Sequence, residues 1–244
     1  MDIVYLFKES PDQGSVELRY SLRSLKNFNH GKVFIVGEKP DWVINVEHVP
    51  VPQNGTKAQN VARNIFAASE TQAISENFIL MNDDFFFMKH QVFTPVLPTL
   101  HWGTMRSVIQ KYDERYSGES LYVNAMKGTL ELLNSRGFEE PLSYELHVPM
   151  ELNKTKVRLA QKMGTEHLSQ FRTFYGNYFG IGGSYMDDVK VFINPKHNDP
   201  KSSANMAAYL QEQSFLSVTG ISFLGGPAGV YIRQQFTEKS PYEV

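Results

Sequence analysis

Two adjacent carboxylates, Asp83 and Asp84, are the residues of this sequence whose type and position most clearly suggest chemistry. They follow the apolar run 78–81 and Asn82, and a second apolar run, 85–88, comes directly after them. Ionised carboxylates between apolar segments are costly unless positive charge lies beside them. A divalent cation that also binds a diphosphate would supply that charge through oxygen ligands. A capping turn is the alternative, since Asn and Asp favour turns; the apolar flanks favour the functional interpretation.

The segments that position this pair have the pattern of an α/β fold. In the helical stretch between the first two strands, Leu18, Leu22 and Leu25 recur at spacings of four and three and form one apolar face. The order strand, helix, strand, strand, helix, strand predicts a mostly parallel sheet with right-handed crossovers, as in nucleotide-binding α/β folds. Ligands bind at the carboxyl ends of such strands, which is where Asp83 and Asp84 fall. The expected buried strands are 3–7, 33–36, 46–49 and 78–81, and the expected helices are 16–28 and 56–75, the second opened by a capping turn at 54–56.

Beyond Pro95 and Pro98 the pattern becomes mainly helical. We expect a helical insertion or subdomain at roughly 99–165 that covers one side of the sheet, within a single catalytic domain spanning 1–244. The expected elements are helices at 102–116, 121–135, 152–163 and 202–213, a glycine- and aromatic-rich loop at 176–184, a strand at 215–218 and a final helical piece after 225–227.

Composition narrows the function classes. The chain has 244 residues, a formal charge of -2 and no cysteine, which excludes disulfides and thiol chemistry. The net charge gives no indication of nucleic-acid binding, although a local basic groove is left open. The sequence shows no membrane span and no secretory signal, so we expect a soluble, cytoplasmic protein. No phosphate-loop, dinucleotide, Gly-x-Ser-x-Gly or zinc pattern occurs, and Gly182, Gly183, Gly225 and Gly226 fit turns better.

Four separate pieces of the sequence, in order along the chain, carry a family resemblance. They are Asp2-Ile3-Val4-Tyr5 with Asp12 and 17–24, then 78–86, then His147-Val148-Pro149 with Phe171-Arg172, and finally Phe192-Ile193-Asn194 with Ser240-Pro241-Tyr242-Glu243. Together they resemble the Stealth family of sugar-phosphate transferases, which includes bacterial capsule polymerases and the lysosomal-enzyme GlcNAc-1-phosphotransferase, and the first two pieces are the most specific. The strand after Asp2 departs from the family by continuing Tyr5-Leu6-Phe7-Lys8.

The resemblance implies an α/β fold like that of nucleotide-sugar transferases (GT-A or Rossmann-like), a nucleotide-sugar donor, and a hydroxyl acceptor, foremost a glycan. It implies transfer of sugar-1-phosphate, which requires charge neutralisation on the diphosphate and a base for the acceptor hydroxyl. The implied site residues are Asp83, Asp84, His147 and Arg172 for catalysis, Asp2, Tyr5, Arg19, Arg23 and Asn82 for the donor, and Asp83, Asp84 and Asn194 for a Mg²⁺ or Mn²⁺ ion.

Each implied role has a plain alternative. Arg19 and Arg23 lie one helical turn apart and suit phosphate oxygens, but the same spacing describes a solvated helix face. His147 suits a general base because imidazole titrates near neutral pH, but a histidine before a proline is often a loop residue. Arg172 would stabilise the migrating phosphoryl charge or stack on neighbouring rings. Asn194 would join the metal shell or end a strand.

Two other functions fit the same residues. A glycosyltransferase would move only the sugar to a glycan, a protein or a modified nucleic-acid base, and would release a nucleoside diphosphate instead of a monophosphate. A non-catalytic sugar- or nucleotide-binding module would use aromatic side chains such as Tyr175, Tyr178 and Tyr185. The module leaves Asp83 and Asp84 unexplained.

Overall fold

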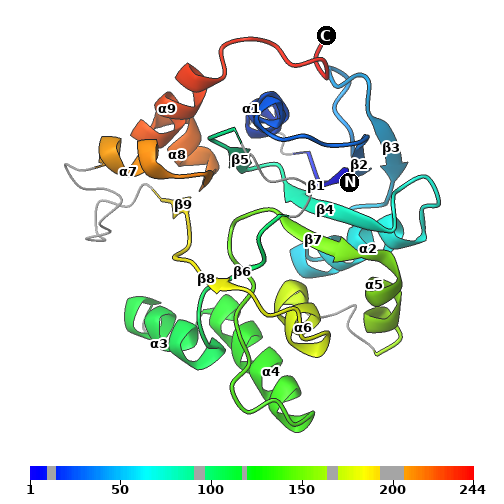
Figure 1. Ribbon diagram of the computed structural model, residues 1–244, viewed down its shortest axis with the longest axis vertical. Helices are drawn as coiled ribbons and strands as arrows, with labels where there is room; N and C mark the ends of the chain where they lie inside the picture. The colour runs from blue at the N-terminus through cyan, green and yellow to red at the C-terminus, as the bar shows by residue number, and fades with distance from the viewer. Residues whose placement is uncertain (10–14, 91–96, 117–119, 164–169, 193–205) are drawn as a thin grey trace.

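A computed structural model of the chain describes residues 1–9, 15–90, 97–116, 120–163, 170–192 and 206–244. Its main sheet has five strands in the order β3-β2-β1-β4-β7 (Figure 1). The first four strands are parallel, and β7 closes the sheet antiparallel to β4. The parallel sheet predicted from the order of apolar runs is confirmed. The strands are β1 (Asp2–Phe7), β2 (Val33–Gly37), β3 (Glu47–Pro50), β4 (Asn77–Asn82) and β7 (Met150–Asn153).

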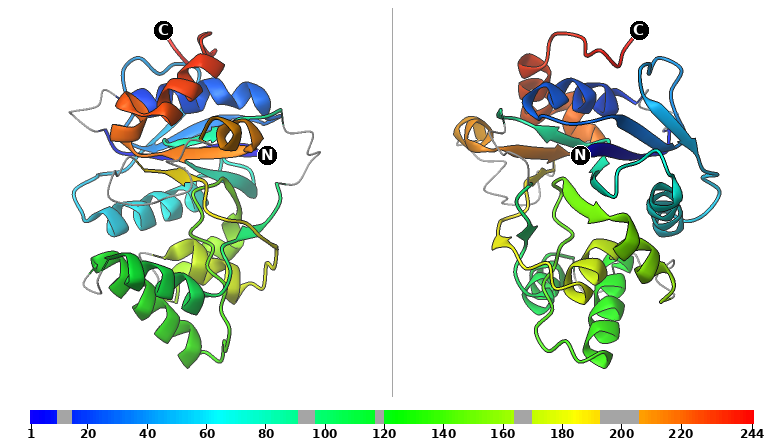
Figure 2. Two further views of the ribbon diagram at one scale, coloured as in Figure 1. Left: turned by 90° about the vertical axis from the view of Figure 1, so that its left-hand side faces the viewer. Right: turned by 45° about the vertical axis from the view of Figure 1, so that its right-hand side comes forward.

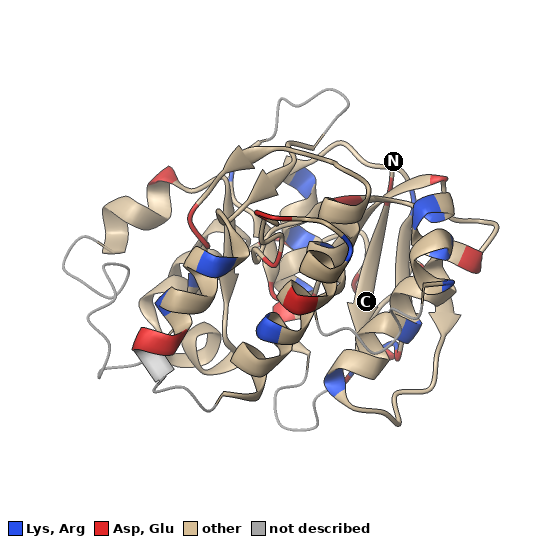
Figure 3. Cartoon of the chain, turned by 90° about the horizontal axis from the view of Figure 1, so that it is seen from below, with Lys and Arg blue, Asp and Glu red and all other residues tan. Residues whose placement is uncertain are grey.

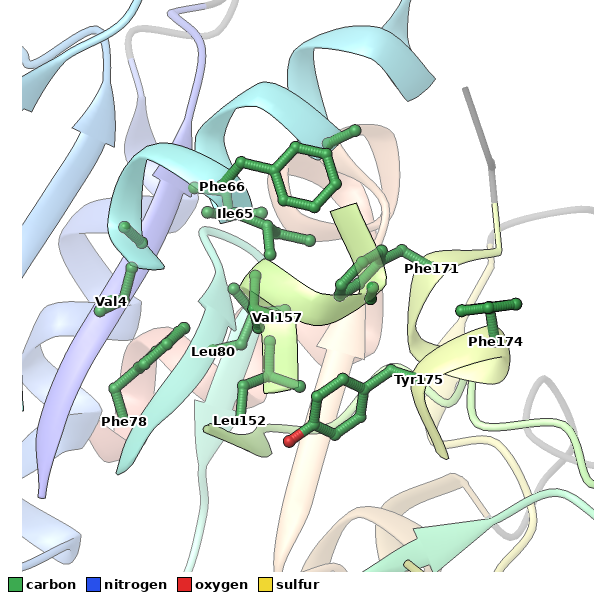
Figure 4. Packing of buried hydrophobic residues seen from close by; sticks show 14 of the residues in the cluster. Val4, Ile65, Phe66, Phe78, Leu80, Leu152, Val157, Phe171, Phe174 and Tyr175 are labelled. Carbon is green, nitrogen blue, oxygen red and sulfur yellow. The ribbon is translucent and has the colours of Figure 1, made fainter. Parts of the chain in front are cut away.

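Helices cover both faces of this sheet, which explains why its central strands are apolar at successive positions. Ile3 and Tyr5 of β1 pack toward α1 (Val16–Ser24), and Val4 and Leu6 pack toward α2 (Lys57–Glu70). Figure 2 shows α1 on one side of the sheet and α2 on the other. Figure 4 shows the α2 side, where Val4 and Leu80 meet Ile65 and Phe66.

The amino end of α2 is fixed by a capping box, as the turn at 54–56 predicts. Thr56 Oγ1 accepts the backbone N–H of Gln59 at 3.3 Å, and Gln59 Oε1 accepts that of Thr56 at 2.9 Å. These two bonds satisfy donors that a helix otherwise leaves unpaired. The helix therefore starts at a defined residue beside the carboxyl ends of β1 and β4.

A second, three-stranded sheet has the order β5-β10-β9 and carries α7, α8 and α9 (Figure 1). Its strand β5 follows Asp83 and Asp84 at once, so the pair lies in the turn between the two sheets. The strand at 215–218 and the helix after 225–227 are confirmed. The elements are β5 (Phe85–Phe87), β9 (Lys190–Val191), β10 (Phe215–Val218), α7 (Met206–Glu212), α8 (Gly220–Gly225) and α9 (Pro227–Gln235).

The remaining elements gather below the main sheet in Figure 1. Helices α3 and α4 contact each other, α4 contacts α6, and α5 packs on α2. A short parallel pair, β6 and β8, joins this layer. The range 99–165 therefore holds helices and also β7, a strand of the main sheet. The elements are α3 (Met105–Tyr116), α4 (Leu121–Ser135), α5 (Lys154–Gln161), α6 (Phe171–Tyr178), β6 (Leu100–His101) and β8 (Ser184–Tyr185).

Three expectations from the sequence are wrong in detail. The helix expected at 152–163 begins only at Lys154, because Leu152 belongs to β7 and pairs with Phe78 of β4. The loop expected from 176 lies partly in α6, whose aromatic side chains Phe171 and Phe174 are buried core. The strand expected to be buried at 46–49 is the exposed edge strand β3.

No helix among the described ranges is long and apolar enough to cross a membrane.

Candidate active site

An open groove of about 660 Å³ lies where β1 and β4 end. Leu6 of β1 pairs in register with Asn82 of β4, so both strands deliver their last residues to the same wall. The amino end of α2 and the end of β10 form the opposite walls. This is the edge of the sheet where open α/β folds bind ligands. The groove is lined by Leu6, Phe7, Lys8, Glu9, Glu17, Gln53, Lys57, Asn60, Val61, Asn64, Asn82, Asp83, Asp84, His147, Lys190, Val218, Thr219 and Gly220.

Asp84 is held by two side chains of the second sheet. Its Oδ2 accepts Lys190 Nζ at 2.7 Å and Ser217 Oγ at 3.0 Å. Lys190 and Ser217 are register partners on β9 and β10, so their side chains reach the same point. Burial alone would raise the pKa of Asp84, but the nearby charges of Lys190 and His147 and the two hydrogen bonds hold it below its usual range. Asp84 is therefore a fixed anion.

Asp83 has the opposite electrostatic environment. Burial, followed by the negative charges of Asp84 and Glu17, raises its pKa to about 7, and Lys190 offsets this only in part. Glu17 is 7% exposed in the first turn of α1, and burial raises its pKa as well. The groove thus contains carboxylates whose repulsion is not fully compensated. Strongly shifted carboxylates in a cleft are typical of functional sites.

His147 faces the groove from the segment before β7 and is paired with Asp188. Its Nδ1 lies 2.8 Å from Asp188 Oδ2, and its backbone N–H donates to Asp188 Oδ1 at 3.1 Å. Asp188 is 6% exposed, so the pair is shielded on the carboxylate side. Phe85 packs edge-on to the imidazole, with ring centroids 6.3 Å apart. An Nδ1–H donated to Asp188 leaves Nε2 as the proton acceptor of the ring.

Arg172 lies behind the groove, not in it. Its Nη1 donates to the carbonyls of Leu146 and Val148 at 3.0 and 2.9 Å, on either side of His147. Its guanidinium carbon stacks over Phe85 at 5.2 Å, in agreement with the stacking alternative. Burial lowers the pKa of Arg172, and Glu145 offsets this effect. Arg172 therefore positions the segment that carries His147.

Two residues predicted to contact the donor lie elsewhere and have structural roles. Asp2 is at the amino end of β1, opposite the groove, where its carboxylate accepts the backbone N–H groups of Lys32 at 2.9 Å and Ser75 at 2.8 Å. Tyr5 is fully buried under α1, and its hydroxyl bonds Ser21 Oγ at 2.8 Å. Neither side chain lines the groove.

Arg19 and Arg23 also have a different partner from the one predicted. Both bind Glu243, at 2.9 and 2.8 Å, and Arg23 also donates to the carbonyl of Phe236 at 3.0 Å. Arg19 and Arg23 are therefore neither placed to contact a donor in the groove nor part of a freely solvated helix face. They tie the carboxyl-terminal segment to α1, and Glu243 has no exposed side-chain surface. Asn194, predicted as a metal ligand, lies outside the described residues.

Sequence reasoning found Asn82, Asp83, Asp84 and His147, which the structure brings together, but missed their partners. Asp188 had a readable signal, because Asp187 and Asp188 precede apolar Val189 just as Asp83 and Asp84 precede Phe85. Lys190, Ser217 and Glu17 had no such signal. Each lies in an ordinary-looking strand or helix and acquires its role only through a long-range contact.

The donor set suits a divalent cation that is held mainly by its substrate. In the part of the chain that the structure describes, no group of three or more His, Asp or Glu side chains is placed to hold a metal. Asp84 is engaged by Lys190, whereas Asp83 has excess negative charge around it. Mg²⁺ commonly takes one or two carboxylates and fills its shell with phosphate oxygens and water. Asp83 fits that requirement. Figure 3 shows acidic and basic positions intermixed along the chain in its view.

Comparison with known proteins defines the fold class. Neither a protein-family model nor a curated protein matches the chain in sequence. The galactosyltransferase LgtC, solved with donor and acceptor sugar analogs, matches with a TM-score of 0.53 at 10% identity, over 99% of this chain and 98% of its own. Mouse xyloside xylosyltransferase 1 matches with a TM-score of 0.36 at 8% identity, over 86% of this chain and 92% of its own. The chain has an α/β fold of the GT-A glycosyltransferase type, as predicted.

Proposed function

We propose that the chain is a transferase that uses a nucleotide-activated sugar and binds it in the groove at the ends of β1 and β4. The observation that carries this proposal is the uncompensated carboxylate Asp83 beside lysines, at the ligand-binding edge of a GT-A-type fold. Fold alone does not determine function. The groove residues supply the chemical argument.

The groove offers positive charge for a diphosphate from several sides. Lys8 follows β1, Lys57 opens α2, and Lys190 lies across on β9 beside Asp84. A divalent ion held by Asp83 would neutralise the leaving diphosphate. The amides of Gln53 and Asn64 bond each other at 2.8 Å and fix the wall that extends from α2. This arrangement binds and orients a charged, extended ligand.

The His147–Asp188 pair is suited to remove the proton of an acceptor hydroxyl. Asp188 accepts from Nδ1 and fixes the tautomer in which Nε2 takes up a proton. As the imidazole becomes positive, the buried carboxylate stabilises it, as a carboxylate does in other His–Asp pairs. Arg172 holds the backbone on both sides of the histidine, so the base has a fixed position.

Sugar transfer without phosphate is the preferred reaction. The fold likeness to LgtC extends over nearly the whole of both chains, and that protein was solved with donor and acceptor sugar analogs. Transfer of sugar-1-phosphate is the second candidate, supported by the Stealth-like sequence pieces. Of these pieces, 78–86 reaches the groove together with Glu17 of the first piece and His147 of the third, whereas Arg23 of the first and Glu243 of the last bind each other away from it.

A panel of nucleotide sugars with mass detection of the released nucleotide tests the proposal. We expect a nucleoside diphosphate from at least one donor in the presence of Mg²⁺ or Mn²⁺. A nucleoside monophosphate with a phosphorylated product would establish the second candidate. Absence of both turnover and nucleotide binding over the whole panel would overturn both. Asp113→Asn is the matched control for groove variants, because Asp113 pairs with Lys127 on the helical layer.

A further inference from the structure

A smaller cavity of about 150 Å³ opens from the groove toward the helical layer. It shares Leu6, Lys57, Val61, Asn82 and His147 with the groove, so the two cavities adjoin each other. Its far wall comes from α4, from the segment before β7 and from the start of α6. A molecule with one end in the groove can therefore place its other end here, beside His147.

Two buried polar atoms of this cavity lack partners among the described residues. They are Nη2 of Arg172 and Oε1 of Gln170. Arg172 is 7% exposed and Gln170 1% exposed, so water in the bulk solvent does not reach them. Buried polar groups are normally hydrogen-bonded, and those that are not require an explanation. A ligand in the cavity provides one.

The unpaired atoms and their neighbours match hydroxyl groups. Arg172 offers an N–H donor, Gln170 offers a carbonyl acceptor, and Glu145 adds a carboxylate whose Oε1 already accepts the N–H of Thr173 at 3.1 Å. A hydroxyl both donates and accepts, so a ring with several hydroxyls can satisfy all of these groups.

The other walls and the balance of charge narrow the ligand further. Val61, Ile65, Leu80 and Phe171 give the cavity apolar sides, which suit the C–H face of a sugar ring. Arg172 faces Glu145, which offsets its charge. Lys57 lies where the cavity meets the groove, and there it serves the diphosphate of the proposed donor. The far wall therefore has no excess positive charge to offset the cost of burying a ligand carboxylate or phosphate. The surroundings therefore favour an uncharged ring.

We propose that this cavity binds the ring of the transferred sugar and selects a neutral sugar over an acidic one, with Arg172 and Gln170 bonding its hydroxyls. The inference rests on the proposed function, because the groove must hold the nucleotide of the same donor.

Binding measurements on the purified protein separate the two proposals. The probes are UDP, UDP-glucose and UDP-glucuronic acid, with GDP and GDP-mannose as a second series. Gln170→Met keeps the size of the side chain and removes its amide, which includes the unpaired carbonyl and the hydrogen bond to Tyr122. Gln110→Met on α3 is the matched control. We expect Gln170→Met to lower the affinity for the neutral nucleotide sugar by about tenfold and to leave the affinity for the free nucleotide unchanged. We also expect Glu145→Gln to narrow the preference for glucose over glucuronic acid.

Each outcome decides one point. If Gln170→Met loses affinity equally for the free nucleotide and the nucleotide sugar, or loses none for either, the cavity does not bind the sugar. The proposed function is not affected by that result. Equal wild-type affinity for glucose and glucuronic acid donors overturns the neutral selectivity. Failure of the wild type to bind any of the five probes or any donor of the nucleotide-sugar panel overturns the proposed function together with the inference. Thermal unfolding of each variant shows that the comparison is made between folded proteins.

Discussion

Two carboxylate clusters of this chain use the same kinds of residue and behave in opposite ways. At Glu243, two arginines and backbone donors surround one carboxylate, and these hydrogen bonds lower its pKa to about 2 although burial opposes the shift. At Asp83, burial and like charges raise the pKa to about 7 despite Lys190. The first cluster is electrostatically complete. The second is stable only with help from protons, a cation or a ligand.

This contrast separates structure from function within one sequence. The Glu243 cluster joins α1 to the end of the chain, and its charges satisfy each other. The Asp83 cluster lies at an open groove and retains unbalanced charge. Proteins tolerate such imbalance mainly where a ligand completes it. Both clusters fall in sequence pieces that resemble one family, so a shared motif does not by itself distinguish a fold-holding contact from a ligand contact.

The largest effect is expected from Asp84→Asn. Removing the fixed anion that orients Lys190 should lower turnover of the nucleotide sugar per folded molecule by about 1000-fold. It should also lower the unfolding temperature, because Lys190 loses its buried partner. Steady-state kinetics and thermal unfolding measure the two quantities, with Asp113→Asn as control. Activity within about tenfold of the wild type would place the reaction elsewhere.

Asp188→Asn should lower kcat by about 100-fold. The amide nitrogen of Asn would donate to Nδ1 of His147 and leave the ring hydrogen on Nε2, where a base must accept a proton. Steady-state kinetics measures kcat, with Asp113→Asn as the control. A wild-type kcat in Asp188→Asn would contradict the assignment of His147 as the base.

Glu243→Gln should lower the free energy of unfolding by about 2 kcal/mol, because Arg19 and Arg23 lose their common partner. Water still reaches part of each arginine side chain, which limits the loss. Urea unfolding measures this change. The kcat of the molecules that remain folded should equal that of the wild type. A lower kcat per folded molecule would mean that the Glu243 cluster also serves the groove.

The two clusters should give opposite pH dependence in protein treated with a chelator. The pKa of Glu243 is lowered on folding, so its stabilisation is present above its usual pKa and is lost as the pH falls toward about 2. The pKa of Asp83 is raised, so its contribution is full below its usual pKa and is lost as the pH rises through about 7. Asp83→Asn should therefore gain on the order of 1 kcal/mol over the wild type between about pH 5.5 and 8. Urea unfolding at the two pH values measures this gain. A difference in the free energy of unfolding between variant and wild type that does not change with pH would contradict the raised pKa of Asp83.

The sequence was sufficient for features set by local pattern. Apolar runs and helical spacing predicted β1, β2, β4, α1 and α4, and the parallel-sheet rule placed Asp83 and Asp84 at the ligand edge. The short strand β7 was missed because its four residues run directly into α5, and the buried Val157 continues an apolar pattern that favours a helix.

Features set by contacts across the chain were not readable. Lys190 meets Asp84 across 106 positions, and Arg23 meets Glu243 across 220. The spacing of Arg19 and Arg23 placed them on one helical face but gave no indication of which charge that face would meet. The segment at 85–87 was read only as an apolar flank because its partner strand, β10, lies far along the chain.

Turnover of a nucleotide sugar by wild type, Asp83→Asn and Glu243→Gln in one assay, with unfolding measured beside it, tests the central claim most directly. We expect that Asp83→Asn loses turnover and stays folded, and that Glu243→Gln loses stability and keeps its turnover per folded molecule. Turnover retained by Asp83→Asn, or an equal loss per folded molecule in both variants, would contradict it.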